Sequence, residues 1–240
     1  MAAQDSAVAP DRPAAIARWL VEAFESGNPL APLPDGIAPR DAEEAEAAAV
    51  AVLDSLDLTP CGVRLRRSGE GAALSGPMLE GRLLRSPAPV SLAALRHPVV
   101  TAAVIGVLAE ALDPDGDAPP VLARLHPALD IAATRFTDPP ADDLALTADL
   151  AGLGLVVAGK AKAMPPATLR VGLLPKGSRG RGTDIDLATA FAQAAAEARR
   201  WGGLPAGALL VVAGLTPPLP AEGTLRATLG ALGGAEASFA

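Results

Sequence analysis

The residues of this chain that could bind a ligand or a metal are few, and the clearest of them lies among apolar residues. Asp130 is the only carboxylate in the two apolar segments 97–108 (HPVVTAAVIGVL) and 127–135 (PALDIAATR). An unpaired charge in apolar surroundings is costly, so Asp130 needs a cationic partner, which Arg64 or Arg135 could supply. A single acid is a poor site for Mg²⁺ or Mn²⁺, because these ions bind through several oxygen ligands. The sequence therefore predicts either a structural ion pair or a pocket acid at Asp130.

Other groups of polar residues have simpler interpretations. The loop 176–182 (KGSRGRG) could hold a phosphate or carboxylate through backbone N–H groups and two arginines, but it lacks the P-loop pattern and we expect a turn. The acidic stretch 113–117 lacks the spaced ligands of a Ca²⁺ loop and predicts a hairpin turn. His97 and His126 have no companion at metal-ligand spacing, so we expect ordinary hydrogen-bonded histidines. No Ser–His–Asp order or GxSxG elbow indicates a triad hydrolase.

Composition excludes several classes of partner. The 240 residues carry a net charge of −7 and contain only six aromatic side chains, none of them Tyr. Nucleic acids and anionic membranes are bound through clustered Lys and Arg, so we expect neither as a partner. Cys61 is the only cysteine, which excludes an internal disulfide and fits a reducing compartment. The chain shows no apolar leader and no run long enough to span a bilayer, so the expected location is the cytoplasm.

The elements that must position these residues begin with two helices. Asp11 can open the first helix and Gly27 can end it. The stretch 41–56 places Ala, Val and Leu at helical spacing opposite three glutamates, which is typical of an amphipathic helix packed on a larger body. Acids in its first turn suit the helix dipole.

After residue 60, short apolar runs broken by Gly and Pro predict strands. The expected strands are 62–66, 78–84, 99–108, 121–131, 153–158, 168–174, 208–213, 224–228 and 235–239. One helix, capped by Thr183 or Asp184 and ended at Gly202, interrupts them. We therefore expect a mixed α/β fold with a helical portion at 1–60 and a β-rich body at 61–240, forming a single structural unit.

Several short motifs follow one another in a recognisable order along nearly the whole chain. They are 62–65 (GVRL), 76–84 (GPMLEGRLL), 98–117, 127–131 (PALDI), 203–207 (GLPAG), 211–220, 223–227 (GTLRA), 232–234 (LGG) and Phe239. In this order the chain resembles the 2-keto-4-pentenoate hydratase group of the fumarylacetoacetate hydrolase superfamily. The resemblance implies a body of folded-over mixed sheets with peripheral helices, oligomeric assembly and activity on 2-oxo acids.

The resemblance also implies a metal site, and this chain departs from it. In that family two glutamates in an ExE pattern and a third acid hold Mg²⁺ or Mn²⁺, the ion chelates the 2-oxo carboxylate, and a lysine handles protons. The bound ion stabilises the enolate as a Lewis acid. Here the ExE positions carry Thr101 and Ala103, the third acid is Asp130, the lysine position carries Arg64, and an asparagine farther on is replaced by Leu150.

By this correspondence Arg64 is expected in the pocket. Arginine stays protonated, so it transfers protons poorly but clamps a carboxylate well. Asp130 would orient it. The candidate catalytic residues are Asp130 and Arg64, and the candidate substrate-binding residues are Arg64, Arg135 and Thr216, with no metal ligand and no cofactor.

Three functions are compatible with this pattern. The first is a divergent hydratase-like protein that binds a small 2-oxo acid or other carboxylate in a metal-free cleft, with hydration or decarboxylation as the lyase-type reaction. The second is a noncatalytic scaffold or partner subunit, a pseudoenzyme in a homo-oligomer or in a complex with a related protein. The third is a conventional Mg²⁺- or Mn²⁺-dependent hydratase with ligands relocated to residues such as Glu80 or Glu110.

Overall fold

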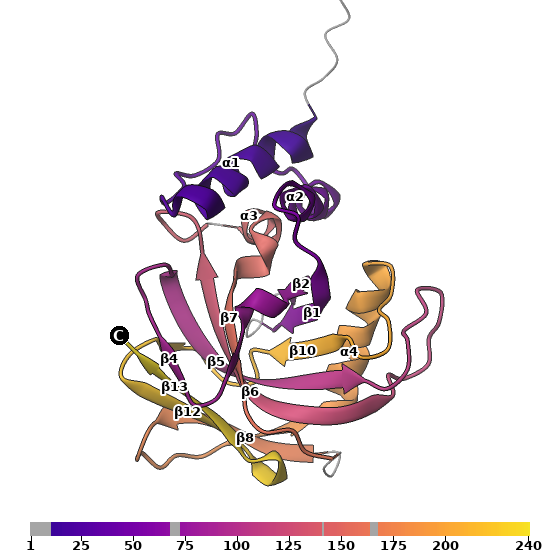
Figure 1. Cartoon of the computed structure of the whole chain (residues 1–240), viewed down its shortest axis with the longest axis vertical. Coiled ribbons are helices and arrows are strands. Elements are labelled where there is room, and N and C mark those ends of the chain that lie inside the picture. Colours follow the sequence, from indigo (N-terminus) through magenta and orange to yellow (C-terminus); the bar gives the residue numbers. More distant parts are fainter. Residues whose placement is uncertain (1–10, 68–72, 141, 164–167) are drawn as a thin grey trace, which may run out of the picture.

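The computed structural model describes residues 11–67, 73–140, 142–163 and 168–240. Figure 1 shows α1, α2 and α3 together at one end of the molecule, above the curled sheets, with α4 beside β10. The helices are α1 (Arg12–Ser26), α2 (Ala42–Ser55), α3 (Asp143–Ala148) and α4 (Leu187–Arg200), with short 3-10 turns η1 (Glu80–Arg82), η2 (Leu150–Gly152) and η3 (Gly230–Leu232). The strands are β1 (Pro60–Arg66), β2 (Leu74–Leu79), β3 (Leu83–Arg85), β4 (Ala88–Val90), β5 (Arg96–Leu108), β6 (Leu122–Thr134), β7 (Leu153–Ala158), β8 (Thr168–Pro175), β9 (Thr183–Asp186), β10 (Leu209–Ala213), β11 (Leu219–Pro220), β12 (Thr224–Leu229) and β13 (Gly234–Phe239).

Two mixed sheets form the body, and the larger one carries the candidate site. Its strand order is β2-β1-β10-β5-β6-β7-β3, with β11 pairing with β5. Strand β10 pairs with β1 in parallel and with β5 antiparallel. Two strands far apart in the sequence, β1 and β10, therefore lie on the same side of the central β5–β6 pair. The smaller sheet has the order β4-β13-β12-β8-β9. The expected mixed α/β fold is confirmed.

The larger sheet is covered on both faces, which explains the long apolar run of β5. Ala102 and Val104 belong to one buried cluster, which the larger sheet shares with the smaller sheet and α4. Ala103 and Ile105 point to the opposite face and belong to a second cluster with α1 and α2. In that second cluster Ile16 of α1 is fully buried, and burying such a side chain contributes about 1.5–3 kcal/mol.

The two N-terminal helices are confirmed with the ends that the sequence predicts. The carboxylate of Asp11 accepts a hydrogen bond from the Ala14 N–H at 3.3 Å, and Gly27 ends α1 with a left-handed φ of 70°. The Asp41 carboxylate accepts from the Glu44 N–H at 2.9 Å at the start of α2. None of the described helices is long and apolar enough to cross a membrane.

Several element boundaries differ from the prediction, including the start of β5 at Arg96 and the end of β6 at Thr134. Residues 183–186 form β9, which pairs antiparallel with β8, so the following helix starts at Leu187. Its cap is Asp186, whose carboxylate accepts from the Ala188 N–H at 2.9 Å; Thr183 and Asp184 do not cap it, because they are held in the sheet. The strand expected at 78–84 is interrupted by the 3-10 turn η1. The sequence analysis also missed α3, which begins with Asp142 as its cap.

Candidate functional site

The residues at the expected metal positions lie on one face of the larger sheet. The β5–β6 register places Thr101 opposite Asp130 and Ala103 opposite Ala128. Across β10, Val211 pairs with both Ile105 and Arg64. Because paired residues of neighbouring strands point the same way, the positions corresponding to the family's lysine and acids share a single face, the one that α1, α2 and α3 cover.

At the centre of this face Arg64 and Asp130 form a buried ion pair. The Arg64 Nε donates to Asp130 Oδ1 at 2.6 Å, and its Nη2 donates to Oδ2 at 2.7 Å. The Arg64 side chain is 0% exposed and that of Asp130 is 1% exposed. Of the two partners that the sequence offered for Asp130, the structure therefore selects Arg64. Charged pairs this deeply buried need further hydrogen bonds to offset the loss of water.

The additional hydrogen bond comes from the segment between α3 and β7. The Arg64 Nη1 donates to the carbonyl oxygen of Ala151 at 2.9 Å. Leu150 and Ala151 both have a φ of 53°, a conformation that non-glycine residues rarely adopt. Gly76 on β2 makes room for this segment, since a Cβ at Gly76 would lie 2.8 Å from the Cβ of Ala151. The segment 149–152 thus closes the sheet face over Arg64.

The remaining donors on this face do not fit a divalent cation. Both oxygens of Asp130 accept hydrogen bonds from Arg64. The Thr101 Oγ1 accepts from the Gly214 N–H at 3.0 Å, and Ala103 offers no ligand atom. A hard cation requires several oxygen ligands, and no cluster of three or more His, Cys, Asp or Glu exists within the described residues. The guanidinium of Arg64 lies beside the Asp130 carboxylate.

A cavity of about 230 Å³ opens one row of side chains farther along the same face. Arg66, Val99 and Ala132 line it, and each lies two residues along its strand from Arg64, Thr101 or Asp130. The rest of its lining is His97, Ala133, Thr134, Pro139, Pro140, Leu146 and Gly152. Burial lowers the pKa of Arg66, and the neighbouring charge of Arg64 lowers it further. We call this cavity the Arg66 cavity; the charge of an anion bound in it would oppose both effects.

Arg135 lies outside this pair and binds a different acid. Its Nη1 is 3.2 Å from Oδ1 of Asp149, and its backbone N–H donates to Oδ2 of Asp149 at 2.9 Å. Asp149 is fully buried and also accepts from the Thr134 hydroxyl at 2.9 Å. Burial raises the pKa of Asp149, while Arg135 opposes the shift. Sequence reasoning missed Asp149; its place in the apolar stretch 148–158 was the available signal.

The other candidate residues have structural partners. The Thr216 Oγ1 accepts from the Ala102 N–H at 3.1 Å, which ties the segment after β10 to β5. His97 Nε2 lies 2.7 Å from the carbonyl oxygen of Thr137, and His126 Nδ1 lies 2.9 Å from that of Gly159. Both histidines are therefore hydrogen-bonded, as expected. The stretch 113–117 forms a turn, and loop 176–182 joins β8 to β9 rather than a strand to a helix.

Comparison with known proteins gives the fold a family context. No protein-family model matches the sequence, and a search of curated proteins returns no match. Among solved structures, the chain is similar to the 4-oxalocrotonate decarboxylase of Pseudomonas putida G7, complexed with magnesium and adipate. The TM-score is 0.80 at 15% sequence identity, over 97% of this chain and 99% of that one.

Two other solved structures match less of the chain. The 2-hydroxyhepta-2,4-diene-1,7-dioate isomerase of Mycobacterium marinum has a TM-score of 0.56 at 13% identity, covering 76% of this chain and 75% of that one. The fumarylpyruvate hydrolase of Pseudomonas aeruginosa, in complex with Mn²⁺ and pyruvate, has a TM-score of 0.57 at 12% identity, covering 74% and 88%. The chain thus shares the fold of these solved structures. Because decarboxylase, isomerase and hydrolase structures all match, the fold does not single out the hydratase group.

Proposed function

We propose that this protein binds a small 2-oxo acid or a related small carboxylate in a cleft where arginine takes the place of a divalent cation. The observation that supports the proposal is the buried ion pair of Arg64 and Asp130, with N–O distances of 2.6 and 2.7 Å. It places a guanidinium group among the positions that correspond to the family's lysine and acids, and this group occupies both oxygens of Asp130.

In this proposal the ligand contacts Arg66, one row of side chains farther along the sheet face than Arg64. The donors of Arg64 are directed to Asp130 and Ala151, so we assign Arg64 and Asp130 a positioning role. Arg66 lines the Arg66 cavity and would bind the ligand carboxylate through two parallel hydrogen bonds. Arg135, which is paired with Asp149 and follows Thr134 in the chain, would add positive electrostatic potential beside the cavity.

Lyase-type chemistry, either hydration or decarboxylation of the 2-oxo acid, is the reaction class that we propose for this cleft. In hydration, water adds to a carbon–carbon double bond conjugated with the 2-oxo group; in decarboxylation, the carbon–carbon bond to a second, distal carboxylate conjugated with that group breaks and CO2 leaves. In both reactions an electron pair is delocalised onto the 2-oxo oxygen as an enolate, which a proton then neutralises. Fixed cationic donors stabilise such charge when they are oriented before the reaction. Arg66 and, behind it, the Arg64–Asp130 pair would supply that orientation in this chain.

A thermal-shift titration with pyruvate tests the binding proposal. At ten times the dissociation constant, a ligand that binds only the folded state adds about 1.4 kcal/mol of stability. For a chain of this size that corresponds to about 3–6 °C in Tm. We expect this shift in the wild type and in Arg85→Gln, whose exposed arginine does not line the Arg66 cavity, and we expect it to vanish in Arg66→Gln. An equal shift in Arg66→Gln would contradict the assignment of Arg66.

A noncatalytic partner subunit is the second candidate, and the closed state of Arg64 favours it. The segment 149–152 covers the sheet face, and Ala103, at an expected ligand position, is fully buried. If pyruvate and longer 2-oxo acids all leave the Tm unchanged, the binding proposal fails and the fold acts as a scaffold. Sedimentation analysis of the chain, alone and with an active protein of the same fold, would then measure its assembly.

Relocated metal ligands receive no support from the geometry of the described residues. Glu80 in η1 and Glu110 beyond the end of β5 are both exposed. Neither joins Asp130 in a cluster of three possible ligands. Metal analysis of protein purified without chelator would overturn this conclusion if it found stoichiometric Mg²⁺ or Mn²⁺.

A further inference from the structure

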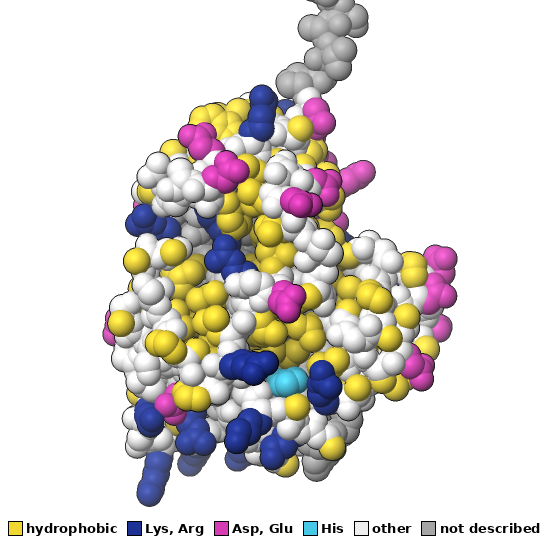
Figure 2. All heavy atoms as spheres, viewed as in Figure 1, with side chains coloured by type: hydrophobic (Ala, Val, Ile, Leu, Met, Phe, Trp, Pro, Cys, Tyr) yellow, Lys and Arg dark blue, Asp and Glu magenta, His cyan; other side chains and the backbone are white. Residues whose placement is uncertain are grey.

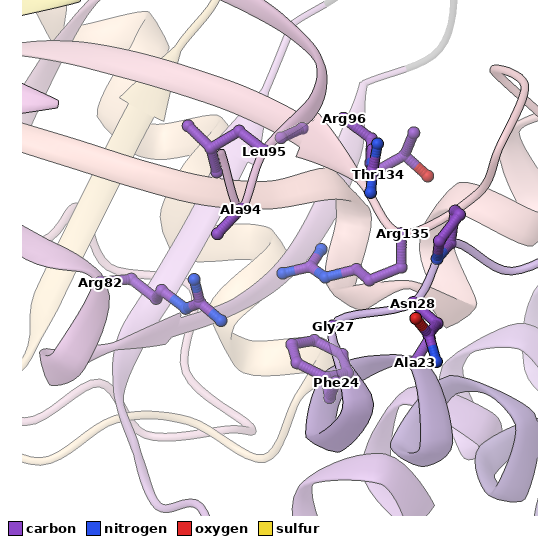
Figure 3. A pocket seen from close by; sticks show the side chains of 12 residues that line it. Ala23, Phe24, Gly27, Asn28, Arg82, Ala94, Leu95, Arg96, Thr134 and Arg135 are labelled. Atoms are coloured by element: carbon purple, nitrogen blue, oxygen red, sulfur yellow. The ribbon is translucent and has the colours of Figure 1, made fainter. Parts of the chain in front are cut away.

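A second cavity, separate from the Arg66 cavity, is lined by three arginines. It has a volume of about 120 Å³ and lies where the end of α1, the turn η1, the start of β5 and the end of β6 meet. Arg82, Arg96 and Arg135 line it together with Phe24 and Asn28. Figure 3 shows the guanidinium groups of Arg82 and Arg135 pointing from opposite sides into the same space, above the ring of Phe24.

Contacts with Phe24 fix the positions of two of these arginines. The guanidinium carbon of Arg135 lies 4.2 Å from the centre of the Phe24 ring, and that of Arg82 lies 5.9 Å from it. Both distances are in the range of cation–π contacts. Contact with the Phe24 ring therefore stabilises the guanidinium groups of Arg82 and Arg135 close to each other, although their charges repel.

The charge of this cavity is not balanced by its own lining. No acid lines it, and Asp149, behind Arg135, is the one carboxylate paired with any of the three arginines among the described residues. Burial and the charge of Arg135 both lower the pKa of Arg82. Figure 2 shows basic side chains on the α1 side, between the helices and the sheets. The cavity thus has three arginines and one paired carboxylate, an excess of positive charge in a chain whose net charge is −7.

We propose that this arginine cavity is a binding site for a compact dianion. The three lining arginines and the one carboxylate that is paired with Arg135 leave two positive charges, which one dianion neutralises. Planar guanidinium groups bind phosphate and carboxylate oxygens in pairs of parallel hydrogen bonds. The volume is about four times the share of a water molecule in the liquid, which is ~30 Å³. Inorganic phosphate or a short dicarboxylate fits this size, and a large cofactor does not.

The site is a different cavity from the proposed 2-oxo acid cleft, to which Arg135 would contribute only its electrostatic potential. The two cavities share Ala133 and Thr134, but Arg66 and His97 line one while Arg82, Arg96 and Arg135 line the other. Binding at the arginine cavity therefore does not require the function proposed above, and each can fail without the other.

Calorimetric titration of the full chain with inorganic phosphate and with succinate, at constant ionic strength, tests the site. We expect saturable binding of one or both anions, and the tighter one identifies the chemical source of the dianion. Arg82→Gln should weaken binding at least about tenfold, since a charged hydrogen bond contributes about 1.5–3 kcal/mol. Arg85→Gln, the matched control on the adjoining strand, should bind as the wild type does.

Other outcomes would overturn the proposal. Unsaturable heats for both anions, binding abolished by an equal ionic strength of chloride, or equal losses in Arg82→Gln and Arg85→Gln would each show that no built site exists. Circular dichroism of each variant confirms that it is folded before titration. Arg66→Gln separates the two proposals, because it should abolish the pyruvate response and leave phosphate or succinate binding intact.

Discussion

Replacing one member of the Arg64–Asp130 pair should destabilise the protein far more than replacing both. Arg64→Met leaves the Asp130 carboxylate without a cation at a position that is 1% exposed, and Asp130→Leu leaves the guanidinium without an anion. Removing one partner of a buried ion pair costs about 3–5 kcal/mol, because the other charge stays buried. For a chain of this length, each single variant should lose about 6–20 °C in Tm.

The double variant Arg64→Met/Asp130→Leu should recover most of this loss. Methionine is shorter than arginine and leucine is larger than aspartate, so the summed side-chain volume stays close to that of the pair. Apolar replacement of a buried ion pair is often neutral or stabilising. The lost hydrogen bond to the Ala151 carbonyl works against this by about 1–3 kcal/mol. We therefore expect the double variant within about 3 kcal/mol of the wild type.

Urea denaturation of the four proteins, followed by circular dichroism, gives the coupling energy directly from a double-mutant cycle. Single variants that each lose less than about 1 kcal/mol would match an exposed ion pair and would refute the closed sheet face. A double variant whose loss equals the sum of the singles would refute the pairing itself.

Four further predictions follow from neighbouring groups. Gly76→Ala should destabilise the protein by about 1–3 kcal/mol through overpacking, because the new Cβ would lie 2.8 Å from the Cβ of Ala151. Gly81→Ala is the control and should be close to neutral, since nothing lies within 4 Å of a Cβ at that position. Urea denaturation measures the free energy of unfolding of both variants. Burial raises the pKa of Asp149 above its ordinary value of 3.8, so the protonated form contributes stability at low pH that is lost as the pH rises through the folded pKa. The wild type should therefore lose stability relative to Asp149→Asn as the pH rises above about 4; parallel pH–stability curves would contradict the shift. Asp186→Ala should cost about 1 kcal/mol as a lost helix cap, with Thr183→Ala, an exposed residue of β9 that does not cap the helix, as the control in thermal denaturation. Millimolar Mg²⁺ or Mn²⁺ should leave the Tm unchanged, because both Asp130 oxygens accept from Arg64; a metal-dependent rise would show that ion ligands persist.

Local signals in the sequence predicted the elements whose ends depend on neighbouring residues. The ends of α1 were predictable because the Asp11 cap and the left-handed Gly27 act within one turn of the helix. The start of α4 was not, since Thr183 and Asp184 are held by pairing with β8, a tertiary contact that overrides capping preference. Asp186 became the cap because the sheet ends there.

The candidate site shows the same division between local and long-range information. The sequence left Asp130 with Arg64 or Arg135 as its partner, and only the placement of β10 between β1 and β5 brings Arg64 to it. Arg135 follows the last residue of β6 and binds Asp149 instead. Arg82 had no signal at all, because the cavity that it lines is assembled from four segments far apart in the sequence.

Charge balance offers a physical reason for the particular residues at this site. In the pattern that the chain resembles, three carboxylates, one lysine and a divalent cation sum to zero. Here one aspartate and one arginine also sum to zero, with Thr101 and Ala103 in place of the two glutamates. A buried region tolerates a neutral, fully hydrogen-bonded group far better than a net charge. A single glutamate at Ala103 would therefore add an unpaired buried charge, and an ion site on this face would require several acids together.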